Sequence, residues 1–169
     1  GSLPTQLVAL VSVAGVVMGT PIADSLESLY ALLSPMVSPL NCTESQGDEL
    51  ASVTRRERSA WLLKHAPPAR LSYYSVVAHA DIEQIAPPLR GVSRMLAASD
   101  PLNDGQVIVS DAILPGSELL ATARSDHWDV ALPRDRHPNI LMRSFGSGRA
   151  YPREALFRAL ITWAVAQSP

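Results

Sequence analysis

Cysteine is almost absent from this chain. The 169 residues contain one, Cys42, so neither a disulfide framework nor a thiolate metal site can be built from cysteine. Cys42 lies in a polar stretch and is interpreted as an incidental thiol. Charge is also sparse: charged residues make up 18% of the chain, against about 25% in an average soluble domain. The net charge of −2 gives no electrostatic basis for binding nucleic acid or an anionic membrane.

Lysine and arginine are missing from the first 54 residues, and the earliest basic residue is Arg55. The apolar run over residues 7–19, LVALVSVAGVVMG, is therefore not preceded by the basic segment of a signal peptide. It is also shorter than the roughly 20 residues that span a bilayer. We expect no transmembrane segment and interpret residues 7–17 as a buried strand. The single cysteine and the lack of a signal lean towards the cytoplasm.

Three apolar runs predict strands. Residues 7–17 are valine-rich and continuously apolar, which is typical of a parallel strand covered on both faces. Leu71–Ala78 is β-branched and aromatic, and Glu118–Ala123 is a third candidate.

Helical patterns alternate with these strands. Thr54, followed three positions later by Glu57, has the spacing of a capping box and predicts a helix to about His65. Leu89–Ala97 follows a Pro-Pro pair, and Arg153–Ala166 has an apolar face behind a starting proline. The alternation predicts a single α/β segment over residues 1–169, with a parallel sheet and flanking helices.

Other segments are less regular. Asp24 or Ser25 can cap a short helix that ends before Pro35. Residues 106–113, QVIVSDAI, fit either an extended or a helical segment. The three arginines between residues 55 and 58 alternate with an acidic residue and are interpreted as a solvated helix face.

Two polar segments follow the predicted strands. Asn103-Asp104-Gly105 taken alone is a turn, because Asn and Asp tolerate turn geometry and Gly supplies a positive φ. Ser125-Asp126-His127-Trp128 comes directly after a predicted strand, where α/β folds place functional loops. A lone histidine there is more often structural. Together, Asp104 and His127 have the chain order acid then histidine, 23 residues apart, which is the order of an α/β-hydrolase triad.

On these and neighbouring segments the chain resembles the C-terminal half of a bacterial α/β-hydrolase of the lipase or esterase type. The segment DPLNDGQV resembles the family's acid loop, and SDHWDVALP resembles its histidine loop. The other matching segments are SVAGVVMGTPIAD, LSYYSVVA, LPGSELL and YPREALFRALITWAV. The resemblance covers most of residues 7–166 and is weakest between 30 and 60. There, such enzymes carry a variable helical cap, so residues 22–66 are expected to form a cap or loop insertion, and 153–166 the closing helix.

The resemblance implies a serine ester hydrolase with His127 as general base and then general acid, and Asp104 as the carboxylate that orients it. Ester or acyl small molecules would be the substrates. No metal and no organic cofactor is expected, because a triad and an oxyanion hole suffice for this chemistry. Asp100 is the rival acid, only four residues from Asp104, which is favoured because it sits in the Asn-Asp-Gly turn.

The nucleophile elbow of this family, G-x-S-x-G, is absent from the 169 residues. Gly91-Val92-Ser93 lacks the second glycine, and Gly146-Ser147-Gly148 follows the histidine. The chain is therefore expected to supply the acid and the histidine of a triad whose serine lies outside it, and to be inactive alone. The alternative is a non-catalytic binding or assembly domain that kept the fold, since fold does not fix function.

Other candidates are weaker. His65, His79 and His137 have no zinc-type spacing with each other or with Cys42, and His79 is interpreted as a strand-end histidine. Asp126 and Asp129, which flank the histidine, are expected to shape or solvate its loop. Trp128 is expected to pack beside the site, and the alternative is that it lines the acyl pocket.

The edge of the predicted sheet leads to one further expectation. In the resembled fold, the strand within residues 7–17 has a neighbour on both sides, one of which carries the nucleophile. Without that neighbour its backbone groups would be unpaired, so the edge should be covered by self-association through residues 7–17 or by a rearranged neighbouring segment. We favour self-association, most simply as a homodimer.

Overall fold

The structure is a computed structural model that describes residues 7, 9–25, 48–133 and 151–166. Its centre is a sheet of three parallel strands in the order β1-β2-β3. The strands are β1 (Ala9–Val13), β2 (Ser72–His79) and β3 (Glu118–Arg124). The predicted α/β class with a parallel sheet is confirmed, and the second and third strands begin and end within one residue of their predicted bounds.

The first strand is shorter than predicted. It ends at Val13 because Ala14 adopts a φ of 48°, in the left-handed region, which turns the chain out of the sheet. Val16 belongs to the same apolar run but packs from a loop against buried apolar residues (Val77, Val107 and Ala112). The strand predicted over residues 7–17 was therefore wrong in its second half, where burial rather than strand pairing accounts for the apolar residues.

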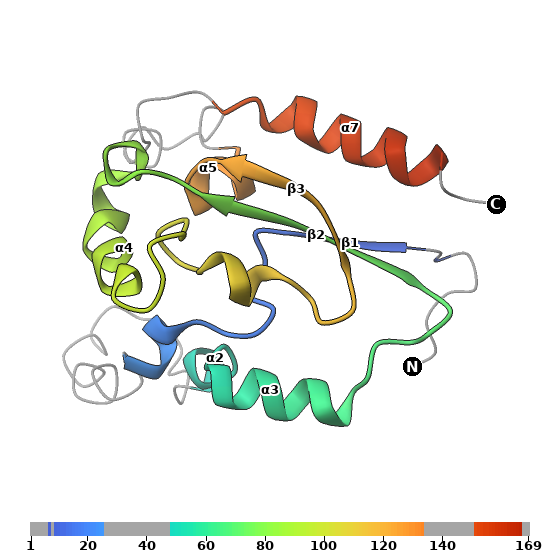
Figure 1. Cartoon of the computed structure of the whole chain (residues 1–169), viewed down its shortest axis with the longest axis horizontal. Coiled ribbons are helices and arrows are strands. Elements are labelled where there is room, and N and C mark those ends of the chain that lie inside the picture. The colour runs from blue at the N-terminus through green and yellow to red at the C-terminus, as the bar shows by residue number, and fades with distance from the viewer. Residues whose placement is uncertain (1–6, 8, 26–47, 134–150, 167–169) are drawn as a thin grey trace, which may run out of the picture.

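Helices flank the sheet (Figure 1). The α-helices are α2 (Asp48–Ala51), α3 (Arg55–Lys64), α4 (Arg90–Ala97), α5 (His127–Ala131) and α7 (Arg153–Ala166). Short 3₁₀ helices are η2 (Ile82–Gln84), η3 (Pro87–Leu89) and η4 (Val109–Ala112). Within the part of the chain described, no helix is long and apolar enough to cross a membrane.

The N-terminus of α3 confirms half of the predicted capping box. The Thr54 hydroxyl accepts a hydrogen bond from the Glu57 backbone N–H at 3.2 Å. The Thr54 N–H, however, donates to the Ala51 carbonyl at 3.1 Å, so the box is not closed by the Glu57 carboxylate. That carboxylate instead lies 3.1 Å from Arg56 Nε.

Two other local predictions needed correction. Residues 21–25 are already helical, so Asp24 and Ser25 do not cap this segment, which starts after Thr20. The remainder of that predicted helix lies outside the described residues. The ambiguous stretch 106–113 contains η4, and its Ile108 pairs with Asn103 in an isolated antiparallel bridge. The cap or loop insertion expected over residues 22–66 stays a prediction, and part of it, 26–47, also lies outside.

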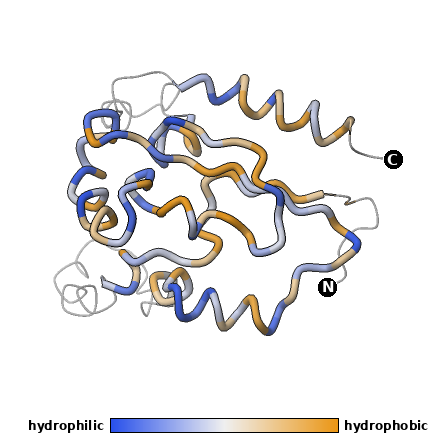
Figure 2. The backbone as a smooth tube through the Cα atoms, in the orientation of Figure 1, coloured by the Kyte–Doolittle hydropathy of each residue, from blue (hydrophilic) through white to orange (hydrophobic). Residues whose placement is uncertain are grey.

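The two faces of the sheet are covered differently. On one face, α5 and α7 pack over small residues of the strands, and the rings of Tyr74 and Trp163 (in α7) meet in a T-shaped arrangement with 4.5 Å between their centroids. The buried cluster there consists of Ala14, Ala78, Ala123 and Val130, with Val13, Ala131, Tyr151 and Leu156 packed against it. The other face is covered by the segment between α4 and β3, whose Ser117 hydroxyl lies 2.7 Å from that of Ser75. Figure 2 shows hydrophobic residues along the strands and alternating hydrophobic and hydrophilic residues along α7.

Candidate active site

The loop that holds Asp104 lies beside the carboxyl end of β2. The Ala80 N–H, just after that strand, donates to the Asn103 carbonyl at 3.1 Å. Asn103 is buried, and its amide group bonds carbonyls of the loop and of α4. The turn predicted at Asn103-Asp104-Gly105 is confirmed, with Gly105 at a φ of 91°. The acid loop is therefore fixed to both β2 and α4.

The Asp104 carboxylate is only 1% exposed and is held at both oxygens. Oδ1 accepts hydrogen bonds from the backbone N–H groups of Gln106 at 2.9 Å and Val107 at 2.8 Å. Oδ2 lies 2.8 Å from Nδ1 of His127. One oxygen is thus occupied by the loop itself, which directs the other towards the histidine.

His127 is the first residue of α5, and its side chain is 17% exposed. Its backbone N–H donates to the Asp104 carbonyl at 2.9 Å, so acid and histidine are joined through main chain and side chain. Because a carboxylate oxygen only accepts, Nδ1 carries the hydrogen of this contact in the neutral ring. Nε2 is then left with a lone pair that can accept a proton, which is what a general base requires.

Asp126 fixes the start of α5. Its carboxylate is 0% exposed and accepts from the Asp129 N–H at 2.8 Å as the helix N-cap. The other oxygen accepts from the Ala86 N–H at 2.8 Å, which joins the histidine loop to the start of η3. Trp128 packs against the apolar cluster of that same region. The expectation that Asp126 shapes the loop and Trp128 packs beside it is confirmed. The spacing Asp126 to Asp129 carried this capping signal in the sequence.

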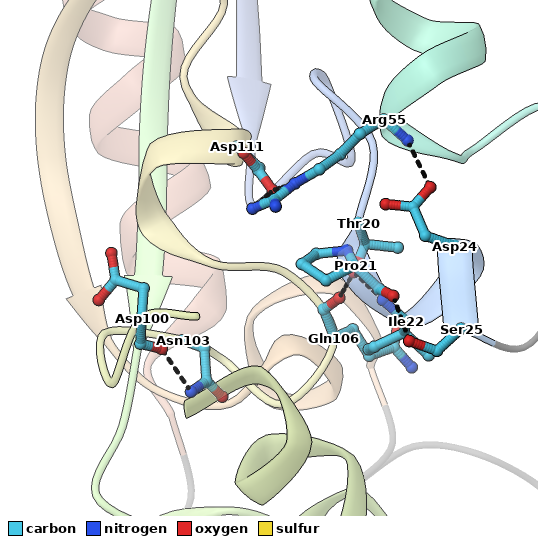
Figure 3. A network of polar contacts seen from close by, with 10 residues as sticks. All are labelled: Thr20, Pro21, Ile22, Asp24, Ser25, Arg55, Asp100, Asn103, Gln106 and Asp111. Carbon is cyan, nitrogen blue, oxygen red and sulfur yellow. Dashed lines mark hydrogen bonds and ion pairs between the residues drawn. The ribbon is translucent and has the colours of Figure 1, made fainter. Parts of the chain in front are cut away.

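Asp100 does not contact the histidine pair. Its side chain accepts from the Leu102 N–H at 2.8 Å and its carbonyl from the Asn103 amide, within the loop that leads to Asp104 (Figure 3). Of the two candidate acids, the structure brings only Asp104 to His127.

The remaining candidates occupy structural positions. His79 ends β2, and the nearby Asp81 pairs with Arg124 at 3.4 Å on the surface. His65 stacks on Trp61 at the end of α3. Ser93 is buried within α4, on no elbow between strand and helix. Cys42, His137 and Ser147 lie outside the described residues. In the described ranges no three His, Cys, Asp or Glu side chains gather as a metal site.

A second polar cluster was not predicted. Arg55 Nε and Nη2 both lie 2.7 Å from Asp111 Oδ2 (Figure 3). Arg58 Nε donates to the Val17 carbonyl at 3.0 Å. The interpretation of these arginines as a solvated face was therefore wrong for Arg55 and Arg58, because α3 lies against the segment that follows β1. Burial raises the pKa of the Asp111 carboxyl, an effect that the Arg55 guanidinium opposes. Asp111 carried no sequence signal, since its partner is 56 residues away.

Comparison with known proteins gives a structural rather than a sequence-family match. No protein-family model matches the chain, and no curated protein matches it. A solved structure, the metagenomic carboxyl esterase MGS0156, is 35% identical with a TM-score of 0.80, over 95% of this chain and 48% of the esterase.

Two lipases share the fold at lower identity. The Staphylococcus hyicus lipase is 11% identical with a TM-score of 0.66, over 95% of this chain and 57% of the lipase. The Bacillus licheniformis lipase BlEst2, in its mature form, is 19% identical with a TM-score of 0.51, over 72% of this chain and 48% of the lipase. The chain therefore has the α/β-hydrolase fold of these esterase and lipase structures, and it spans about half the length of the carboxyl esterase that it resembles.

Proposed function

We propose that this chain supplies the acid and the histidine of a serine carboxylic-ester hydrolase, whose nucleophilic serine is provided by a segment outside these 169 residues. The observation that carries the proposal is the 2.8 Å contact between Asp104 Oδ2 and His127 Nδ1, with Asp104 Oδ1 already occupied by two backbone N–H groups. The carboxyl esterase resemblance supports the same chemistry.

In this proposal, His127 Nε2 removes the proton of the serine hydroxyl as the serine attacks the ester carbonyl. The imidazolium that forms is stabilised by the Asp104 carboxylate and then gives its proton to the leaving alcohol. In the second half of the cycle, His127 removes a proton from water as the water attacks the acyl-enzyme carbonyl, and the imidazolium then returns that proton to the serine oxygen as the acid product leaves. Asp104 also keeps the imidazole in the tautomer with a free Nε2, because its Oδ2 occupies Nδ1.

The absence of a G-x-S-x-G motif favours the alternative, a binding or assembly domain without activity. The hydrogen bonding of the Asp104 carboxylate argues against this alternative. A buried carboxylate costs free energy unless it is fully hydrogen-bonded, and here its bonds are arranged so that one oxygen serves the histidine alone. A domain that only binds has no need for that arrangement, so we favour the hydrolase.

The test joins this chain to a nucleophile. We would replace the aligned region of the metagenomic carboxyl esterase by these residues and measure hydrolysis of short p-nitrophenyl esters. The chimeric esterase is expected to turn over and to be labelled by a fluorophosphonate at a serine contributed by the esterase. The 169-residue chain alone is expected to do neither. A fluorophosphonate label on a serine of this chain, accompanied by turnover, would overturn the proposal.

A further inference from the structure

We propose that Thr20 is a positioning residue for the acid–histidine pair. Its hydroxyl fixes the peptide group between Gln106 and Val107, and the N–H of that same peptide group binds Asp104. The functional meaning of this role rests on the proposed function, whereas the contacts themselves do not. Thr20 lies in the segment after β1, 86 residues before Gln106, and had no place among the candidate residues identified from the sequence.

The contacts run through a single peptide. The Thr20 hydroxyl donates to the Gln106 carbonyl oxygen at 2.7 Å (Figure 3). That carbonyl belongs to the peptide whose N–H is the Val107 N–H, and this N–H donates to Asp104 Oδ1 at 2.8 Å. Asp104 Oδ2 then meets His127 Nδ1 at 2.8 Å. Thr20 therefore holds one end of a peptide dipole whose other end holds the acid.

Burial makes this contact strong. Thr20 is 7% exposed, and Val107 and Asp104 are each 1% exposed, so little water competes for the groups between them. In such surroundings hydrogen bonds in series polarise one another. A hydrogen bond to the Gln106 carbonyl strengthens the Val107 N–H as a donor and fixes the direction in which it points. The Val107 N–H and the Gln106 N–H together hold Oδ1 and so set the carboxylate rotamer that presents Oδ2 to His127, and the direction of the Val107 N–H contributes to that rotamer.

Thr20 has a second role that must be separated from this one. Its hydroxyl oxygen lies 3.4 Å from the Ile22 N–H, and its carbonyl accepts from the Ala23 N–H at 3.1 Å, at the start of the helical residues 21–25. The hydroxyl has one proton, however, and that proton goes to Gln106. Ser25 provides a matched control, since its hydroxyl donates to the Pro21 carbonyl within the same helical turn and is exposed.

The experiment uses nuclear magnetic resonance on the whole 169-residue chain and needs no substrate. It measures solvent exchange of the Val107 amide proton and of the His127 Nδ1 proton. Thr20→Val keeps the shape of the side chain but removes the hydroxyl, and is expected to speed both exchanges about tenfold, the factor for loss of one hydrogen bond. Thr20→Ser restores the hydroxyl and is expected to return both rates to within about twofold of the original chain. Ser25→Ala is expected to leave both unchanged.

Each outcome decides the inference. Unchanged exchange in folded Thr20→Val overturns it, and so does equal acceleration by Ser25→Ala, which would assign the effect to the helix start. If Thr20→Val does not fold, the Thr20 hydroxyl proton of the unchanged chain decides: slow exchange supports the inference, and rapid exchange with water overturns it. An inactive chimeric esterase with the predicted exchange pattern would reject ester hydrolysis and keep the positioning role. An active chimeric esterase, with exchange unchanged by Thr20→Val, would support ester hydrolysis and reject the positioning role of Thr20.

Discussion

The acid–histidine loops and the first strand differ in how far their interactions are completed within this chain. In the loops after β2 and β3, Asp104 and Asp126 are buried, and each accepts backbone hydrogen bonds from the described residues. β1 is hydrogen-bonded to β2, and among the described residues no strand pairs with its other side. Its Leu10 is 43% exposed.

This difference separates two requirements of the fold. The geometry of the acid and histidine depends on contacts that lie within residues 80–131 and on Thr20, all of which this chain provides. The other side of β1, where no described strand pairs, needs a partner to satisfy its backbone hydrogen bonds. Different substitutions should therefore disturb the geometry of the acid–histidine pair and the pairing of β1. Four predictions follow from this comparison.

The largest effect is expected at the histidine. In the chimeric esterase, His127→Ala should reduce kcat by about 10⁴-fold or more while leaving the fold intact, because no other group removes the serine proton. Asp104→Asn should also reduce kcat strongly. Asp100→Asn is the matched control and should change kcat little, since its carboxylate bonds only the Leu102 N–H among the contacts described. Ester kinetics with folding checked by circular dichroism measure this. A greater loss for Asp100→Asn would reverse the assignment of the acid.

The next effect concerns β1. Val13→Lys should lower the free energy of unfolding by about 1–3 kcal/mol, because Val13 packs against the buried cluster under α5 and α7. Leu10→Lys should change stability by less than about 0.5 kcal/mol, since Leu10 is largely exposed. Both lysines should weaken the self-association that we predict through this strand. Denaturant titration and light scattering separate the two effects. A monomer at high concentration, with rapid exchange of those amides of residues 9–13 that are not hydrogen-bonded to β2, would contradict the predicted association.

An effect of similar size tests the acid loop without changing its polar side chains. Gly105→Ala should cost about 1–3 kcal/mol, because a side chain is strained at a φ of 91°. Its Cβ would also lie 3.0 Å from Leu89 Cβ. Gly116→Ala is the control: its φ is 79°, and nothing lies within 4 Å of the added atom. Denaturant titration gives the loss in unfolding free energy for each variant: Gly116→Ala measures backbone strain alone, and Gly105→Ala measures strain together with the Leu89 contact. Equal losses would mean that Leu89 gives way freely.

The smallest effect is the pH dependence contributed by Asp111. Burial raises its pKa in the folded chain above the ordinary value of 3.8, with Arg55 opposing. Between pH 3.8 and the higher folded pKa, the folded state holds more protons than the unfolded state, so this group makes stability fall as the pH rises. Asp111→Asn should remove that fall from a plot of unfolding free energy against pH. An unchanged slope would mean that Arg55 fully offsets the burial.

Local patterns predicted much of this fold. β2, β3 and α7 were predicted almost to the residue, because each combines an apolar pattern with a proline, a glycine or a polar turn at its boundary. The end of β1 was not, since an apolar run reports burial and does not reveal that Ala14 has a positive φ. The Asp104–His127 pair was predicted from residue order and a family resemblance, and the structure brings the two side chains together.

Contacts between distant segments were beyond the sequence. The hydrogen bond from Thr20 to Gln106 and the ion pair of Arg55 with Asp111 join residues 86 and 56 positions apart. Neither pair has a spacing or composition that distinguishes it from other polar residues. Only the way α3 and the segment after β1 pack against the loop of residues 104–111 brings them together.

The double link between Asp104 and His127 also affects motion. The backbone contact, His127 N–H to the Asp104 carbonyl, and the side-chain contact both close the same 23-residue loop. The entropy of closing a loop is lost once, when the first contact forms, so the second forms at almost no further cost in chain entropy. The imidazole can therefore swing away from the carboxylate while the backbone contact keeps the loop closed. It returns by rotation about its own side-chain bonds, on the timescale of side-chain motion rather than that of loop rearrangement.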